Sequence, residues 1–286
     1  MIYSKTLALK METKFKEFAI KVEGTPFSRL KNYGDLIEIR SYGNTKEGKI
    51  SNIIKYQKDI LKKHYVDGNI DPIIEDLIHI ALATFCVDSL VKRDVNRNRF
   101  FSRNIKIIIP VSNKQRWEKV RNLLEQTISF MTYDTYKYKF IKGKTKTFNN
   151  KEQSAEFNSV ALFSGGLDSF VGSHFLLSKN YKPIFLSVNH SGINKIVSKL
   201  HESLPKETKK VILGIEKSVS AIEYTQFSRS FLYLTLALAI ARPYNNVNKI
   251  FIPENGIIAL QIGLRDGRFG TRTAHPRYLN YFSSFI

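Results

Sequence analysis

The sequence has few of the residues on which several common protein classes depend. It holds a single cysteine, Cys86, in 286 residues, so it can form neither an internal disulfide nor a CxxC zinc or persulfide motif. Cys86 stands in an apolar stretch with helical spacing, which favours a buried, unreactive thiol. No signal-peptide pattern opens the chain, and its longest apolar stretch, 231–241, is too short to span a bilayer. The sequence therefore predicts a soluble cytoplasmic protein without a membrane segment.

Acidic residues are also scarce relative to basic ones. The chain has 25 Asp and Glu against 45 Lys and Arg, a formal net charge of +20. The excess is spread along the chain, +13 in residues 1–150 and +7 in residues 151–286. Such a field attracts nucleotides, nucleic acids and acidic proteins. A genome rich in Lys and Asn codons would give the same excess, so a nucleic-acid partner is compatible with the charge and not required by it.

The first 150 residues combine helical and strand patterns and predict an α+β N-terminal domain. The helix expected over 71–93 has Asp71 as its cap and Pro72 in its first turn. The other elements expected in this half are strands at 37–40 and 105–109, the latter stopped by Pro110, helices at 52–65 and 113–130, and an exposed basic hairpin over 135–148 around Gly143.

A polar stretch at 149–154 marks a predicted domain boundary, after which strand and helix patterns alternate. We expect strands at 159–163, 184–188, 210–215 and 249–253 and helices at 167–178, 194–204 and 226–242. This alternation predicts an α/β domain over 151–286, a parallel sheet with helices on both faces. Ligands of such sheets bind beyond the carboxyl ends of the strands.

The clearest chemical motif lies at the first of these strand ends. It consists of Ser164, Gly165, Gly166, Leu167, Asp168 and Ser169, between a strand and a helix. The glycines permit a tight turn with N–H groups facing an anion, and the helix start adds further donors. Ser164 and Ser169 can donate to phosphate oxygens. Asp168 would repel phosphate unless a cation lies between them, which predicts Mg²⁺.

Other nucleotide signatures are missing. The sequence has neither GxxxxGK[ST] nor a GxGxxG motif after a strand, which excludes a Walker P-loop and leaves a Rossmann dinucleotide site unsupported. The competing interpretation of residues 164–169 is a structural corner whose glycines merely allow the turn.

The string SGGLDS resembles the PP-loop of the N-type ATP pyrophosphatases. Residues 225–242, 252–256 and 271–276 resemble QueC-like proteins (7-cyano-7-deazaguanine synthase relatives), and the last two resemble the QueC-like proteins of Qat-type anti-phage cassettes. Residues 75–93, 105–111 and 130–134 resemble the extra N-terminal domain of that group, so the similarity covers about 70–280. The resemblance implies an adenine nucleotide alpha hydrolase-like fold and ATP and Mg²⁺ as cofactors.

The chain departs from the family at one point. QueC-like proteins usually carry zinc-binding cysteines near the C-terminus, and this chain has none. Zinc is therefore not expected, and residues 151–286 are interpreted as a nucleotide domain that is C-terminally incomplete, from a short member or a fragment.

Several other residues are candidates for the same site. Arg229 and Ser230 begin a helix, where phosphate or ribose can bind, or are an exposed cap. Glu254 and Asn255 follow the last strand, where they could bind Mg²⁺ and substrate or form a tight turn. A donor-rich loop holds Gly267, Arg268, Gly270, Arg272, Thr273 and His275. In it Arg272 is a candidate for stabilising phosphate charge and His275 for binding substrate, and His190 could face the same cleft.

The resemblance, together with these features, implies an ATP-dependent carbon–nitrogen ligase. In the reaction that it implies, a carboxylate, such as a 7-deazaguanine acid, attacks the α-phosphate of ATP, pyrophosphate leaves, and an amine displaces AMP to give an amide or nitrile. The amine is ammonia or a protein amine, so a protein substrate or a partner from the same defence cassette is compatible. The alternatives are a basic, nucleotide-dependent module that binds nucleic acid or a defence protein, and a tRNA-modifying ligase.

Overall fold

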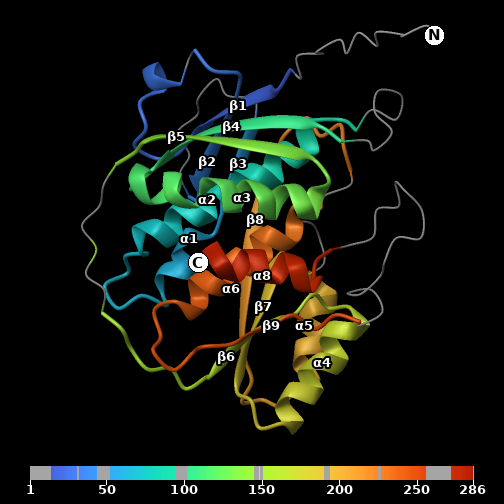
Figure 1. Ribbon diagram of the computed structural model, residues 1–286. Helices are drawn as coiled ribbons and strands as arrows, with labels where there is room; N and C mark the ends of the chain where they lie inside the picture. The colour runs from blue at the N-terminus through green and yellow to red at the C-terminus, as the bar shows by residue number, and fades with distance from the viewer. Residues whose placement is uncertain are drawn as a thin grey trace, which may run out of the picture.

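The computed structural model describes residues 14–30, 32–43, 52–93, 102–144, 148, 151–189, 194–224, 227–255 and 272–285. Within these ranges, nine strands form one sheet in the order β5-β4-β1-β2-β3-β8-β7-β6-β9 (Figure 1). The strands are β1 (Lys16–Lys21), β2 (Asp35–Ser41), β3 (Asn52–Tyr56), β4 (Asn104–Val111), β5 (Thr135–Lys142), β6 (Ser159–Leu162), β7 (Pro183–Asn189), β8 (Lys209–Ser218) and β9 (Ile250–Phe251).

The helices follow the apolar spacing of the sequence, and two of the described ones begin at a side-chain cap. They are η1 (Phe27–Arg29), α1 (Lys58–Lys62), α2 (Pro72–Leu90), α3 (Lys114–Thr132), α4 (Leu167–Ser178), α5 (Asn194–Glu202), α6 (Arg229–Ala241) and α8 (Pro276–Phe285). The Asp71 side chain caps α2 by accepting from the Ile73 amide at 2.9 Å. Of the helices in the described ranges, none combines the length and the apolar character that crossing a bilayer requires.

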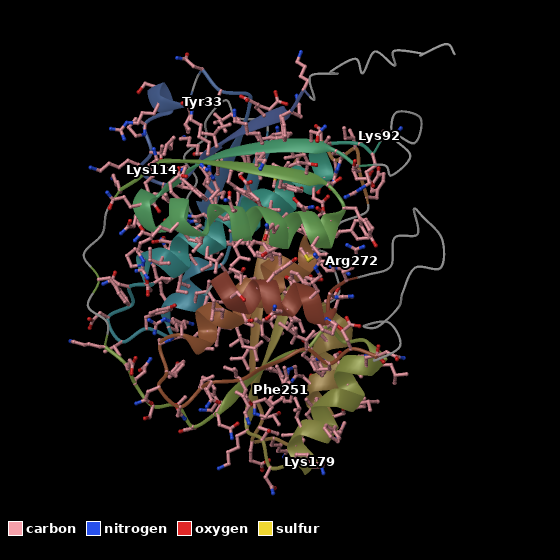
Figure 2. All side chains as sticks on the ribbon, viewed as in Figure 1. Tyr33, Lys92, Lys114, Lys179, Phe251 and Arg272 are labelled. Atoms are coloured by element: carbon pink, nitrogen blue, oxygen red, sulfur yellow. The ribbon has the colours of Figure 1, made fainter. Side chains whose placement is uncertain are left out.

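The sheet has two halves that run in opposite directions. Seven of its eight strand pairings are parallel, and only β3 with β8 is antiparallel. The carboxyl ends of β1–β5 therefore lie at one edge of the sheet and those of β6–β9 at the opposite edge. Lys114, which follows β4, and Arg272 are on opposite sides of the view in Figure 2.

Helices cover both faces of the C-terminal half. Val160 of β6 and Leu186 of β7 belong to a large core that also contains residues of α2, α3 and α6. The alternate residues, Ala161 and Phe185, belong to a second core with residues of α4 and α5. The period of two along a strand sends these neighbours to opposite faces, so the expected α/β class is confirmed.

A buried ion network joins the two halves. Asp88 near the end of α2 and Asp134 before β5 pair with Arg93 and Arg103, and all four side chains are at most 9% exposed. Asp88 also accepts from the amide and hydroxyl of Ser228, at 3.0 and 2.8 Å. The N-terminal half therefore fixes the start of α6 in the C-terminal half.

Most predicted elements are confirmed, with shifts at their ends. The helices expected at 71–93, 113–130, 167–178, 194–204 and 226–242 and the four strands of the C-terminal half are all present. The predicted boundary at 149–154 lies on the connection between the two halves of the sheet. The sheet itself is continuous, because each strand is hydrogen-bonded to the next.

The expected helix at 52–65 is wrong in its first part. Residues 52–56 form β3, between β2 and β8, because Ile54 and Tyr56 alternate into the core. Pro110 lies within β4 and does not end it. Proline has no N–H to donate, but β1 pairs with β4 only as far as Ile108, so Pro110 leaves no hydrogen bond to β1 unmade.

The predicted basic hairpin is also wrong. Residues 135–142 form a single edge strand parallel to β4, with Tyr136, Tyr138 and Phe140 buried. Of the second arm only residues 143, 144 and 148 are described, and none of them lies in a strand. The five strands of the first half are parallel to one another, which differs from the α+β arrangement expected for residues 1–150.

Candidate functional site

The SGGLDS segment forms the turn between β6 and α4, at the carboxyl edge of the C-terminal half. Gly165 has a φ of +78°, which L side chains rarely adopt, and a Cβ there would lie 2.9 Å from the Val197 side chain. A glycine is therefore required at this position both by the backbone and by the approach of α5. Leu167 is 76% exposed, so the loop opens to solvent.

The serines of the loop hold its shape from within. Ser169 Oγ donates to the Gly166 carbonyl at 2.8 Å and lies 3.2 Å from Ser164 Oγ, which accepts from the Gly166 amide at 3.3 Å. The N-cap residue of α4 is Gly166, and no side chain of the described residues caps the helix. The N–H groups of its first turn are therefore available to an anion, and the helix dipole favours negative charge there.

Two carboxylates lie beside this loop. Gly172 is one turn after Asp168 on α4, and a Cβ there would lie 2.5 Å from Pro253 Cβ, so the segment after β9 packs closely on this face of the helix. Glu254 follows Pro253, and burial and then the charge of Asp168 raise its pKa, while Arg229 lowers it. The fold thus gathers Asp168, Glu254 and Arg229 beside the uncapped end of α4.

The start of α6 contributes to the same edge. Arg229, its first residue, is exposed, and Asp88 holds the preceding Ser228 in place. The Ser230 hydroxyl is 2.8 Å from that of Thr273, so it already has a partner within the chain. Of the two residues predicted here for the nucleotide, Arg229 therefore has the freer side chain.

Asn189 is a candidate that the sequence analysis missed. It ends β7 at the same edge, and its Oδ1 is buried with no hydrogen-bond partner among the described residues. Two residues earlier, the Ser187 hydroxyl donates to the Phe163 carbonyl at 2.6 Å, so this end of β7 lies against the loop. Its position at the end of a predicted strand is the only feature of the sequence that points to Asn189. The predicted His190 lies outside the described residues.

Arg272 and His275 have their described contacts with Phe130 and Tyr133. The Arg272 guanidinium stacks on Tyr133 and Phe130, at 3.6 and 4.4 Å from the ring centroids, and donates to the Phe130 carbonyl at 2.5 Å. His275 contacts the edge of the Phe130 ring, at a centroid separation of 5.2 Å. Both side chains attach the segment before α8 to α3. The loop residues Gly267, Arg268 and Gly270 lie outside the described residues.

The groups available to a metal are few. Within the described ranges there is no set of three or more His, Cys, Asp or Glu side chains that could hold a metal ion on their own. Mg²⁺ in nucleotide sites commonly uses one or two carboxylates and completes its shell with phosphate oxygens and water. Asp168 and Glu254, which repel each other electrostatically, fit that smaller requirement. Asn255, which follows them, is exposed.

Comparisons with protein-family models, with curated proteins and with solved structures find no match for the chain. Any functional conclusion therefore rests on the residues of the chain and on their arrangement.

Proposed function

We propose that the chain is an ATP-dependent ligase of the PP-loop, QueC-like type, with an adenine nucleotide alpha hydrolase-like fold in its C-terminal half. The observation that carries the proposal is the uncapped start of α4 after β6, with Asp168, Glu254 and Arg229 beside it. Few structural roles require an open glycine turn, free helix N–H groups and two facing carboxylates at the ligand-binding edge of a parallel sheet.

In the proposed reaction a substrate carboxylate oxygen attacks the α-phosphate of ATP, and the bond to the β-phosphate breaks to release pyrophosphate. The amine then attacks the acyl carbon, loses a proton and displaces AMP to form an amide. Backbone N–H groups at residues 165–169 would bind the phosphates, and Arg229 would balance charge on the leaving group. Where the amine is ammonia, the oxygen of the primary amide would attack the α-phosphate of a second ATP with release of pyrophosphate, and loss of AMP and a proton would give the nitrile.

Asp168 and Glu254 would hold Mg²⁺ between themselves and the phosphates. When bound, the cation neutralises phosphate charge and favours pyrophosphate as a leaving group. Asn189 Oδ1, the buried acceptor without a partner among the described residues, is placed to accept from an N–H of the base or of the substrate. These roles use the chain's own groups mainly for orientation and charge stabilisation.

The proposal is tested by exchange of labelled pyrophosphate into ATP, with mass spectrometry of the products formed from candidate deazapurine acids. The change Asp168→Ala should lower the Mg²⁺-dependent rate about 100-fold or more. The change Glu118→Ala, at a half-buried position on α3, should leave the rate unchanged. Formation of ADP as the only nucleotide product, or equal rates for Asp168→Ala and the parent, would contradict the proposed chemistry.

A further inference from the structure

The N-terminal half has its own topological switch point. Its strand order, β3-β2-β1-β4-β5, starts at β1 and proceeds outward in both directions. The connection from β4 to β5 is α3, which packs on the face that buries Tyr138. The connection from β1 to β2 places Tyr33 beside Lys139, on the opposite face, with 3.2 Å between Lys139 Nζ and the Tyr33 hydroxyl. Crevices at such reversals, beyond the carboxyl ends of the strands, are where α/β sheets bind ligands.

A cavity of about 380 Å³ occupies this position. Residues at the carboxyl ends of all five strands line it, among them Val22, Ser41, Tyr56, Ser112 and Lys144. The first two turns of α2 form another wall. The volume lies within the range of about 300–1,000 Å³ that is typical of small-molecule sites.

Cationic groups surround the opening. Lys58, Lys62 and Lys144 line the cavity, and the start of α2 adds partial positive charge. The Lys144 side chain lies over Gly24, where a Cβ would be 2.7 Å from its Cδ, and its amine has no acidic partner among the described residues. Lys144 is therefore available to an anionic ligand.

The acidic groups of the cavity wall are largely compensated within the protein. Glu75 pairs with Lys58, and Asp76 accepts from the amide and hydroxyl of Ser112 and from Trp117 Nε1 at 2.7–2.8 Å for the shortest contacts. Glu23 is the remaining acid at the rim. The wall thus offers carboxylate and hydroxyl oxygens to polar groups of a ligand. Lys144 offers positive charge to its anionic end, and so does Lys62, whose own partner is the exposed Asp59 at 3.1 Å.

We propose that this cavity binds a nucleoside monophosphate, at a site separate from the ATP site proposed for the C-terminal half. Its phosphate lies at Lys62 and Lys144, and its sugar hydroxyls donate to acceptor oxygens deeper in the cavity. The size of the cavity, its place at the switch point and a lysine with no acidic partner in the described part of the chain all favour a small polar anion over an extended polymer.

The chain contains a built-in reporter for this site. Trp117 is its only tryptophan, and its Nε1 donates to Asp76 Oδ2 at 2.8 Å. Asp76 lines the cavity, so occupancy should change the emission of Trp117. The SGGLDS loop is at the opposite edge of the sheet, and nucleotide bound there leaves this tryptophan unaffected.

The experiment is a titration with 5′-AMP, adenosine and inorganic phosphate, with tryptophan excited at the red edge of its band. We expect a saturable change with AMP and weaker responses to adenosine and to phosphate. Lys144→Glu should raise the dissociation constant for AMP at least about tenfold, equivalent to about 1.4 kcal/mol. Lys144 is exposed, so the fold tolerates this change.

Two control variants separate this site from the ATP site. Lys142→Glu alters the same charge two residues away, outside the cavity wall, and should bind AMP like the parent. Asp168→Ala should also keep the tryptophan response, even if it loses ATP chemistry. The inference is overturned if AMP leaves the emission of Trp117 unchanged, if Lys142→Glu weakens binding as much as Lys144→Glu, or if Asp168→Ala abolishes the response.

Discussion

The two halves of the sheet present their ligand-binding edges in different ways. In the C-terminal half the groups proposed to bind phosphate lie mainly in one turn of chain, residues 164–169, with Arg229 and Glu254 beside it, and helices cover both faces of the strands. In the N-terminal half the cavity draws on five strand ends and on α2, and the face opposite α3 carries ion pairs such as Lys21 with Glu38 and Lys106 with Glu17. A site formed by one continuous segment can be recognised as a sequence motif, whereas a site formed by several strand ends can be recognised only in the folded structure.

The largest effect is expected where the halves are joined. Arg103→Met removes one cation from a network whose carboxylates, Asp88 and Asp134, are fully buried. Leaving buried charge uncompensated should lower the free energy of unfolding by about 3–5 kcal/mol. Urea unfolding followed by circular dichroism measures the change, and a single shared transition would show that the halves unfold together.

The matched control for this change is Arg121→Met. Arg121 pairs with Glu118 on the exposed side of α3, with 41% and 33% of the two side chains exposed. Its loss should cost less than about 1 kcal/mol. Equal costs for the two variants would mean that the buried network does not hold the halves together.

A smaller effect is expected at the contact between α4 and the segment after β9. Gly172→Ala places a Cβ 2.5 Å from Pro253 in the present geometry, so one of the two must move. We expect a loss of about 1–3 kcal/mol in unfolding free energy, together with weaker binding of Mg²⁺–ATP because Glu254 moves from Asp168. Calorimetric titration with Mg²⁺–ATP and thermal unfolding measure the two effects.

Val171→Ala, at an exposed position next to Gly172, serves as the control and should change neither quantity appreciably. Unchanged affinity in a destabilised Gly172→Ala variant would separate the packing of α4 from the nucleotide site and remove Glu254 from that site.

A pH effect of modest size is expected beneath the SGGLDS loop. Burial, and then the charge of Lys210, lower the pKa of His201 from 6.5 to about 4, and its ring packs on Phe163 at 4.7 Å between centroids. Protonated His201 is favoured in the unfolded chain. The stability that a neutral His201 gives the folded protein is therefore complete above pH 6.5 and is lost as the pH falls towards 4. Melting temperatures across this window should fall more for the parent than for His201→Phe. Parallel curves would show that His201 is not held neutral by the fold.

The smallest effect is expected on the outer strand of the N-terminal half. Lys137 is 54% exposed and pairs with Glu125, which is 8% exposed and keeps a hydrogen bond from the Tyr138 amide when the lysine is lost. Lys137→Met should therefore change the unfolding free energy by less than about 1 kcal/mol. Because Lys137 is engaged with Glu125 and Lys139 lies against Tyr33, we also expect the double change to Met to leave retention on single-stranded RNA unaltered. A marked, salt-sensitive loss of retention would instead favour the basic binding module.

The sequence predicts the C-terminal half better than the N-terminal half for a physical reason. The strands at 184–188 and 210–215 and the helix at 167–178 have apolar spacing that local pattern rules capture. The strand at 52–56 is short, and its Ile53 and Ile54 fit a helix or a strand equally until β2 and β8 flank it. For such short apolar segments, pairing with strands from elsewhere in the chain decides between helix and strand.

The candidate site shows the same division. The position of residues 164–169 between strand and helix follows from the sequence, and so does the placement of Glu254 after a strand. That Arg272 stacks on Tyr133 does not, because the contact joins residues 139 positions apart. Likewise, the buried acceptor of Asn189 is recognisable only when its neighbours are known.

The reversal of strand direction between β3 and β8 determines how a small molecule could pass from one site to the other. It places the two carboxyl edges on opposite sides of a close-packed sheet, and a tunnel between them would have to cross the core around Ile54, Tyr56 and Ile215. A compound released at one edge must therefore diffuse through bulk solvent to reach the other. Each edge then samples the surrounding concentration of its own ligand, with no direct hand-over inside the protein.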